Sequence, residues 1–161
     1  MAFAIREATE ADLGVIEELI RALADYERLS HEVTMDSDAL RRWLFGIRPY
    51  AEVLIGEEDG MAVGFALFFH NFSTFLGRPG IYLEDLFVRP EHRSKGYGRA
   101  LLQRLAELAV ERDCGRLEWA VLDWNEPAIG FYRKLGARPN DDWTVFRLAG
   151  DALRDLAGSK P

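Results

Sequence analysis

The chain has one cysteine in 161 residues, and this scarcity excludes a whole class of small, cross-linked architectures. Cys114 alone can form neither an internal disulfide nor a multi-cysteine metal site. The three histidines, His31, His70 and His92, show no metal-ligand spacing, so we expect no metal. A chain of this length can bury an ordinary hydrophobic core, which is then the source of its stability.

Long apolar runs and a surplus of basic residues are also missing. Nothing approaches transmembrane length, and Arg6, Glu7, Glu10 and Asp12 interrupt the N-terminal stretch. We therefore expect no membrane segment, no signal peptide and a cytoplasmic location. The formal net charge of −7 argues against a nucleic-acid surface and favours small cationic partners.

The composition is that of one globular domain. Hydrophobic residues make up 48% and charged residues 29% of the chain, and no internal repeat or linker stands out. We expect a single domain over residues 1–157 and a disordered tail over residues 158–161.

Alternating helical and strand patterns predict the element order. The boundaries of these elements follow from the regular spacing of apolar residues and from three local signals. These signals are a possible cap at Asp36 or Ser37, an Asp-Gly hairpin over residues 57–60 and a loop over residues 71–80. They predict a mixed central sheet of six to seven strands flanked by about four helices, in α/β (α+β) terms. The expected strands are 2–6, 53–56, 61–69, 81–88, 117–122 and 143–148, and the expected helices are 10–25, one ending at 44, 99–112, 127–135 and a last turn at 151–156.

The stretch from residue 81 to residue 110 is the most informative part of the chain. An apolar strand over residues 81–88 carries two adjacent carboxylates, Glu84 and Asp85. A basic, glycine-containing turn over residues 93–98 follows, and an amphipathic helix starts at once. Backbone N–H groups at a helix N-terminus lack helical partners and favour an anion. The ligand that this pattern indicates is a pyrophosphate.

Three interpretations compete for this turn. A dinucleotide fingerprint needs a third glycine where the chain has Leu101, and antiparallel-looking strands precede the motif. A P-loop needs Gly-Lys followed by Ser or Thr, which is absent. Two glycines before a helix can also form a purely structural turn, so the surrounding sequence has to decide.

That context resembles the GNAT superfamily of acyl-CoA-dependent N-acetyltransferases across almost the whole chain. Some segments resemble its spermidine/spermine (diamine) acetyltransferase branch more closely. Ser94 departs from that branch, which commonly has glycine there; a serine permits the turn if its φ is negative. The matching segments are Arg93-x-x-Gly96-x-Gly98, Ala24-Asp-Tyr-Glu27, Tyr82-Leu-Glu-Asp85, and Trp124-Asn-Glu-Pro127 joined to Phe131-Tyr132-Arg-Lys-x-Gly136-Ala137.

The resemblance implies acetyl-CoA as the acyl donor. The amides of residues 94–99 would bind the pyrophosphate, with charge from Arg93 and Lys95. The backbone of Phe87 and Val88 would pair with the pantetheine arm, and an N–H near Phe87 would stabilise the oxyanion. Asn125 would contact pantetheine or simply cap a helix. The expected donor-binding set is Phe87, Val88, Arg93, Ser94, Lys95, Gly96, Tyr97, Gly98, Arg99, Asn125 and Tyr132.

Two residues are candidates for proton transfer. By resemblance Glu84 acts as the base through a water, although a carboxylate near pKa 4 is a feeble base unless its pKa is raised. Strand alternation puts Glu84 and Asp85 on opposite faces unless a bulge turns both toward the cleft. Alternatively, each carboxylate pairs with an arginine. Tyr132 is the candidate acid for the leaving thiolate, unless it is an aromatic core residue.

The acceptor is expected to be a small, flexible polyamine or diamine that attacks directly in a ternary complex. Its binding residues would be Tyr26, Glu27, Glu84 and Asp85, with Glu27 equally explicable as a solvated charge at a helix end. Thialysine or another lysine-like amino acid is the neighbouring alternative. A protein-lysine acetyltransferase and an inactive acyl-CoA sensor are more distant ones. Related enzymes lead us to expect a homodimer.

Overall fold

The computed structural model describes residues 2–160, which fall into two compact units, residues 2–122 and 123–160. In the first unit the elements are β1 (Phe3–Glu7), α1 (Leu13–Tyr26), α2 (Ser37–Phe45), β2 (Glu52–Glu58), β3 (Met61–Ser73), β4 (Arg78–Val88), α3 (Tyr97–Glu111) and β5 (Leu117–Trp119), with short 3-10 turns at Glu10–Asp12, Ser30–Glu32 and Pro90–His92. In the second they are α4 (Glu126–Lys134) and α5 (Gly150–Gly158).

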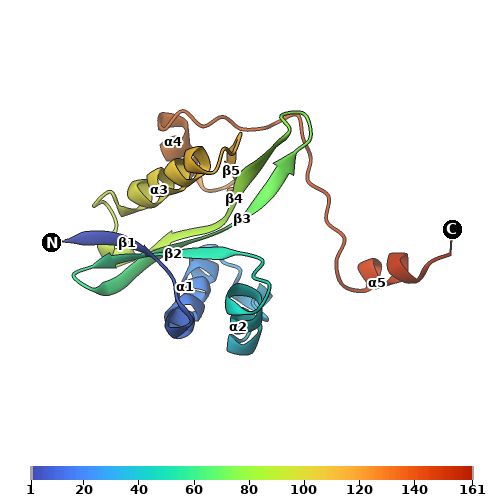
Figure 1. Cartoon of the computed structure of the whole chain (residues 1–161), viewed down its shortest axis with the longest axis horizontal. Helices are drawn as coiled ribbons and strands as arrows, with labels where there is room; N and C mark the ends of the chain where they lie inside the picture. The colour runs from blue at the N-terminus through green and yellow to red at the C-terminus, as the bar shows by residue number, and fades with distance from the viewer. Residues whose placement is uncertain (1, 161) are drawn as a thin grey trace. The chain divides into compact units, whose positions relative to one another are not determined.

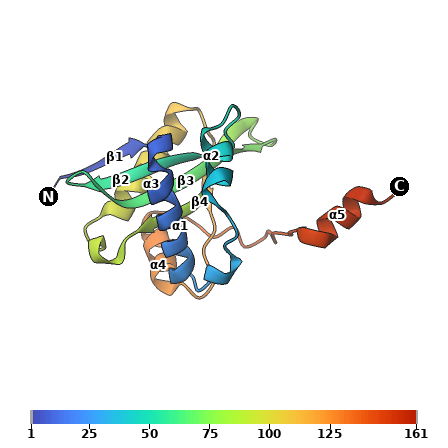
Figure 2. The same ribbon diagram turned by 90° about the horizontal axis from the view of Figure 1, so that it is seen from below.

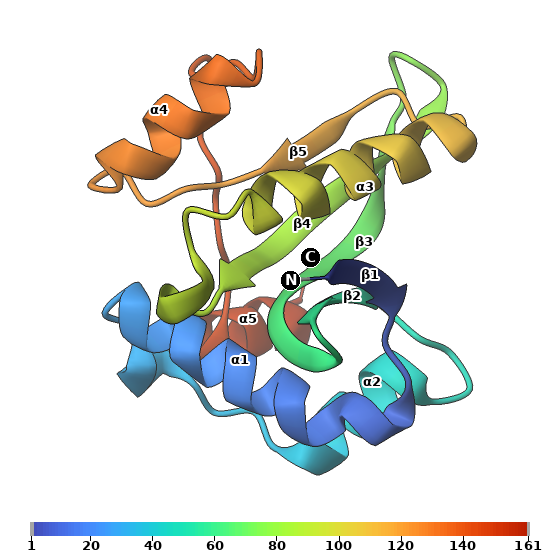
Figure 3. The same cartoon turned by 90° about the vertical axis from the view of Figure 1, so that its left-hand side faces the viewer.

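The first unit is built on one mixed sheet in the order β1-β2-β3-β4-β5. Neighbouring strands are antiparallel except for the last pair, β4 and β5, which is parallel. Helices α1 and α2 cover one face of the sheet and α3 covers the other (Figures 1 and 3). The predicted fold class is confirmed, and this strand order excludes a doubly wound dinucleotide-binding sheet.

The two helical layers bury the apolar stripes that the sequence predicts. On α1, Ile16, Leu19 and Leu23 point into a core that contains Phe65 and Phe87 of the sheet. Figure 2 shows α1 lying across this face of the strands. On the opposite face, Leu101 and Leu105 of α3 are fully buried. Residues spaced three and four apart share one helix face, so both helices have one side for the core and one for solvent.

Turn chemistry sets the strand connections. The predicted Asp-Gly hairpin is confirmed, because Asp59 and Gly60 adopt φ values of 50° and 84°, the two positive angles that a tight hairpin turn needs. The loop predicted over residues 71–80 is wrong for most of its length. Asn71 pairs with Gly80 and Phe72 with Pro79, so β3 and β4 continue almost to a short turn. The loop-like composition of the segment did not prevent antiparallel pairing.

The strand count is also lower than predicted. The described residues contain five strands instead of six to seven, and five α-helices instead of about four. The strand predicted over 117–122 ends at Trp119, and residues 143–148 form no strand. Alternating side chains favour a strand only where a neighbouring backbone is present to complete its hydrogen bonds. Within the described range, residues 143–148 have no such ladder partner.

The second unit contains α4 and α5, joined by a segment without regular structure. Asn125 is the N-cap of α4, and its Oδ1 accepts a hydrogen bond from the Ala128 N–H at 3.4 Å. Helix α5 confirms the helical turns predicted near residues 151–156. The predicted single domain, residues 1–157, includes residue 1, which lies outside the described range. The predicted disordered tail, residues 158–161, includes residue 161, which also lies outside it. Both stay predictions. Among the described residues no helix is both long and apolar enough to cross a membrane.

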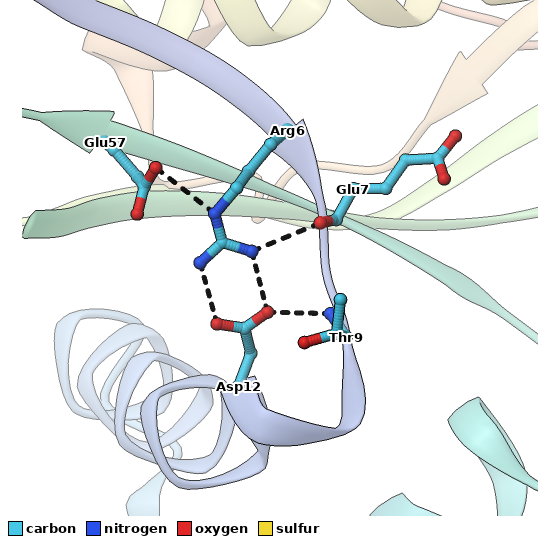
Figure 4. Close-up of polar contacts among 5 residues, drawn as sticks. All are labelled: Arg6, Glu7, Thr9, Asp12 and Glu57. Atoms are coloured by element: carbon cyan, nitrogen blue, oxygen red, sulfur yellow. Dashed lines mark hydrogen bonds and ion pairs between the residues drawn. The ribbon is translucent and has the colours of Figure 1, made fainter. Parts of the chain in front are cut away.

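The start of α1 is fixed to the sheet by one arginine (Figure 4). Arg6 on β1 donates two hydrogen bonds of 2.8 Å to the carboxylate of Asp12, and its Nε lies 3.2 Å from Oε1 of Glu57 on β2. Asp12 also accepts from the Thr9 N–H at 2.7 Å, as in a capping box. The hydrogen bonds from Arg6 lower the pKa of Asp12 to about 2. Arg6 and Asp12 therefore fix the start of α1 relative to strands β1 and β2.

Replacing Asp12 with asparagine tests this contact. Because the folded-state pKa lies below the unfolded value, the ionised carboxylate stabilises the fold above about pH 4 and loses that effect as the pH falls through 2. We expect Asp12→Asn to lower the free energy of unfolding by about 1–2 kcal/mol at pH 7, since Arg6 is partly exposed. Urea titration at pH 7 and at pH 2–3 should show the difference shrinking with acid. Equal stability of the two proteins at pH 7 would show that the contact between Arg6 and Asp12 does not stabilise the fold.

Candidate active site

A β-bulge in β4 interrupts the strand at its two adjacent carboxylates, Glu84 and Asp85. Leu67 of β3 pairs with Asp85 and Phe68 pairs with Leu83, so Glu84 is an extra residue without a partner on β3. An inserted residue interrupts the alternation of side chains along a strand. This is the bulge that the sequence required if both Glu84 and Asp85 were to face one cleft.

Three carboxylates gather at this point. Burial, the negative charge of Glu84 and that of Glu27 together raise the pKa of Asp85 to about 7. Burial and Glu84 also raise the pKa of Glu27, which directly follows α1. Glu84 itself is exposed. The structure thus brings together three of the four residues predicted to bind the acceptor.

The protonation states of these groups differ. A buried carboxyl beside two others is favoured in its neutral form, because the charged form loses water and meets like charges. With its pKa raised to about 7, Asp85 exchanges its proton near neutral pH. Among the described residues no group of three carboxylate, histidine or cysteine side chains is arranged to hold a metal. The cluster suits a cation that can lose a proton.

Beside this cluster the edge of β4 is open. Strand β5 pairs only with Ile81, Tyr82 and Leu83. From the bulge to Val88, β4 has β3 on one side and, within residues 2–122, no strand on the other. Phe87 and Val88, predicted to pair with the donor, lie on this open stretch. A strand edge of this kind can add an extended ligand by backbone hydrogen bonds.

The turn that follows β4 has the backbone of an anion site. Ser94 and Gly96 have φ values of 64° and 83°, with Lys95 between them outside the left-handed region. Such alternation directs successive N–H groups into one concavity. The first helical hydrogen bond of α3 runs from the Ala100 N–H to the Gly96 carbonyl. Within the described part of the chain, the N–H groups of residues 94–99 donate no backbone hydrogen bond.

Ser94 does not meet the condition of a negative φ, since its φ is 64°. A non-glycine residue in the left-handed region costs about 1 kcal/mol. The turn keeps the shape that a glycine would adopt, at some cost in strain.

The two cations of the turn are held by the protein itself. Arg93 stacks its guanidinium over Tyr26 at 4.8 Å and over Phe87 at 5.3 Å, and its Nε donates to the Val88 carbonyl at 2.9 Å. Lys95 donates to Glu58 at 2.9 Å. Both were predicted to add charge at the pyrophosphate. Here Arg93 ties the turn to the end of α1 and to β4, which leaves the backbone N–H groups as the main anion donors.

Glu58 is the site residue that sequence reasoning missed. It ends β2, just before the Asp-Gly turn, where a charged side chain is normally solvated. Its carboxylate is instead buried against residues 92–97. Those partners are more than 30 positions away in sequence, so no local pattern could reveal the contact.

Tyr132 and Asn125 belong to the second unit. Tyr132 lies on α4 next to Phe131, with the two ring centroids 5.7 Å apart. Asn125 caps that helix, which was the simpler of its two predicted roles. The exposed Arg99 lies in the first turn of α3.

Comparison with known proteins gives a consistent result. The Acetyltransferase (GNAT) family matches residues 13–137. The chain is 44% identical to the thialysine N-epsilon-acetyltransferase of Bos taurus, over 98% of this chain and 99% of the bovine one. It is 30% identical to the spermidine/spermine N(1)-acetyltransferase-like protein 1 of Homo sapiens, over 96% of this chain and 24% of the human one. An integron cassette protein from the mobile metagenome of V. cholerae has the same fold, with a TM-score of 0.83, 26% identity and 99% of both chains covered.

Proposed function

Because the chain belongs to the acetyltransferase (GNAT) family, we propose that it transfers the acetyl group of acetyl-CoA to the primary amine of a small, flexible, cationic acceptor. Family membership confirms the resemblance seen in the sequence and the assignment as an amine acetyltransferase. The acceptor is a lysine-like amino acid such as thialysine, or a diamine or polyamine. The carboxylate cluster around Asp85 is the observation that carries this choice.

The donor would lie along the open edge of β4 and over the turn at residues 94–99. The diphosphate accepts hydrogen bonds from the N–H groups of Ser94 to Arg99, and the dipole of α3 favours its charge. The pantetheine arm pairs with the backbone of Phe87 and Val88. A backbone N–H near Phe87 donates to the oxyanion that forms when the amine attacks.

The carboxylates have different roles toward the acceptor amine. Exposed Glu84, with Glu27, attracts the ammonium group, and Tyr26 borders the same site. Asp85, whose pKa lies near 7, accepts the proton that the amine must lose before it attacks. Glu84 was predicted to be the base, but the raised pKa that such a base needs is found at Asp85.

Tyr132 would supply the proton for the leaving coenzyme A thiolate. A phenol and an alkyl thiol have pKa values of about 10 and 8.5, close enough for efficient proton transfer. The cytoplasmic location and the homodimer expected from the sequence stay predictions.

An acceptor panel tests the proposed function. Purified protein with acetyl-CoA should acetylate at least one of thialysine, lysine, ornithine, putrescine and spermidine, measured as release of free thiol. We expect kcat/KM for the best of these to exceed that for a lysine-containing peptide, because a small cationic chain approaches the three carboxylates more freely than a peptide does. No thiol release with any amine would contradict the proposal, and preference for the peptide would shift it to protein acetylation.

The pH dependence separates Asp85 from Glu84. With one fixed acceptor, we expect wild-type kcat/KM to fall below pH 7 as Asp85 becomes protonated. Asp85→Asn should lower kcat/KM by about 10²-fold or more and remove that step. Glu84→Gln removes a negative neighbour, so the step should move to lower pH while turnover persists. Glu107→Gln on the exposed side of α3 is the control. If the fall of kcat/KM below pH 7 disappeared in Glu84→Gln and remained in Asp85→Asn, Glu84 would be the base.

Tyr132→Phe tests the proposed acid. Without the hydroxyl, the thiolate must leave unprotonated, and we expect kcat to fall by about 10²-fold. The dissociation constant of acetyl-CoA, measured calorimetrically, should stay close to the wild-type value. Unchanged turnover in the variant would remove the acid role from Tyr132.

A further inference from the structure

A buried carboxylate lies beneath the proposed diphosphate-binding turn. Glu58, the last residue of β2, is only 7% exposed. Its Oε1 accepts hydrogen bonds from the Tyr97 hydroxyl and from Nζ of Lys95, the latter at 2.9 Å. Its Oε2 lies 2.9 Å from Nδ1 of His92. A buried charge is retained only where partners compensate its loss of water. For Glu58 these partners are Tyr97 and Lys95, which donate hydrogen bonds, while the His92 ring lies in contact without donating one.

The three residues come from one short segment, and they enclose the turn. His92 precedes it, Lys95 lies within it, and Tyr97 is the first residue of α3. The Tyr97 ring also stacks on Phe3 of β1, with centroids 3.9 Å apart and planes 6° from parallel. Both ends of the turn are therefore attached to a single point on the sheet. The hydrogen bond from Tyr97 lowers the pKa of Glu58 to about 2, so the carboxylate stays ionised at neutral pH.

We propose that Glu58 is a positioning residue, which orders the N–H groups of residues 94–99 for the donor diphosphate through His92, Lys95 and Tyr97. This inference rests on the proposed function. Glu58 does not touch the donor or the reacting atoms. Its effect comes from the fixed positions of the hydrogen-bond donors, because an N–H group turned away from the diphosphate no longer donates a hydrogen bond to it.

The direction of the effect separates positioning from simple electrostatics. Glu58 carries a negative charge close to the proposed anion site, and it forms an ion pair with Lys95 of the turn. If charge alone mattered, neutralising Glu58 would free Lys95 and tighten donor binding. If Glu58 orders the turn, neutralising it weakens donor binding even though the site becomes more positive.

The test compares Glu58→Gln with Glu57→Gln. Glu57, the neighbouring residue, pairs with Arg6 and has no contact with residues 92–97, so it controls for loss of one charge from the same strand. We expect Glu58→Gln to raise the acetyl-CoA dissociation constant and KM by about ten- to a hundredfold, with kcat at saturating donor little changed. Glu57→Gln should leave the donor constants unchanged. Tyr97→Phe, which keeps the ring on Phe3, should weaken donor binding in the same direction.

A donor without a diphosphate shows whether the effect passes through the turn. With S-acetyl-pantetheine, kcat/KM should be the same for wild type and Glu58→Gln. Equal losses with both donors would indicate general damage to the fold and overturn the inference, as would unchanged or tighter acetyl-CoA binding in Glu58→Gln. Wild-type protein that failed to bind acetyl-CoA would instead overturn the proposed function itself.

Discussion

The bulge at Glu84 is the constraint on which the candidate site depends. In a regular strand, Glu84 and Asp85 would face opposite layers, and one would enter the packed face of the sheet. The extra residue places Asp85 opposite Leu67 and lets Glu84 act on the same group of side chains. Burial is the main cause of the raised pKa of Asp85, and the bulged Glu84 adds charge repulsion to it.

The same point in β4 is where the sheet stops being continuous. Strand β5 ends its pairing at Leu83, one residue before the bulge. The carboxylate cluster and the free strand edge therefore begin together. A donor paired with Phe87 and Val88 would bring its thioester close to residues that attract and deprotonate an amine.

Charge is distributed unevenly across this region. The proposed acceptor side concentrates three carboxylates, whereas the proposed donor side has basic side chains that the fold already uses. Arg93 is held by Tyr26, Phe87 and the Val88 carbonyl, and Lys95 is held by Glu58. In the proposed site, recognition of the diphosphate would then depend on ordered N–H groups, whose positions are set by contacts elsewhere in the fold.

Local sequence chemistry predicted most of the fold. Asp59-Gly60 indicated its hairpin, Asp36 its helix cap, and the apolar spacing of α1 and α3 their buried faces. Predictions that depended on distant partners were less successful. Residues 143–148 have the pattern of a strand but form no ladder, and Asn71, Pro79 and Gly80 have loop-like composition but pair in a sheet.

The candidate site shows the same division between local and distant information. The bulge could be proposed as an alternative, since two adjacent carboxylates in a strand otherwise have no common face. The role of Glu58 could not, because its partners are far away in sequence and its own neighbours suggest a solvated turn. The positive φ of Ser94 was not expected either, because it is imposed by the path of the chain from β4 into α3.

In the proposed mechanism Asp85 is the carboxyl that exchanges its proton near neutral pH. Carbon-13 NMR of side-chain carboxyl groups, assigned with Asp85→Asn, measures this directly in the unliganded protein. We predict that the Asp85 resonance titrates near pH 7 and moves toward lower pH in Glu84→Gln. A resonance that titrates near pH 4 in both proteins would contradict it.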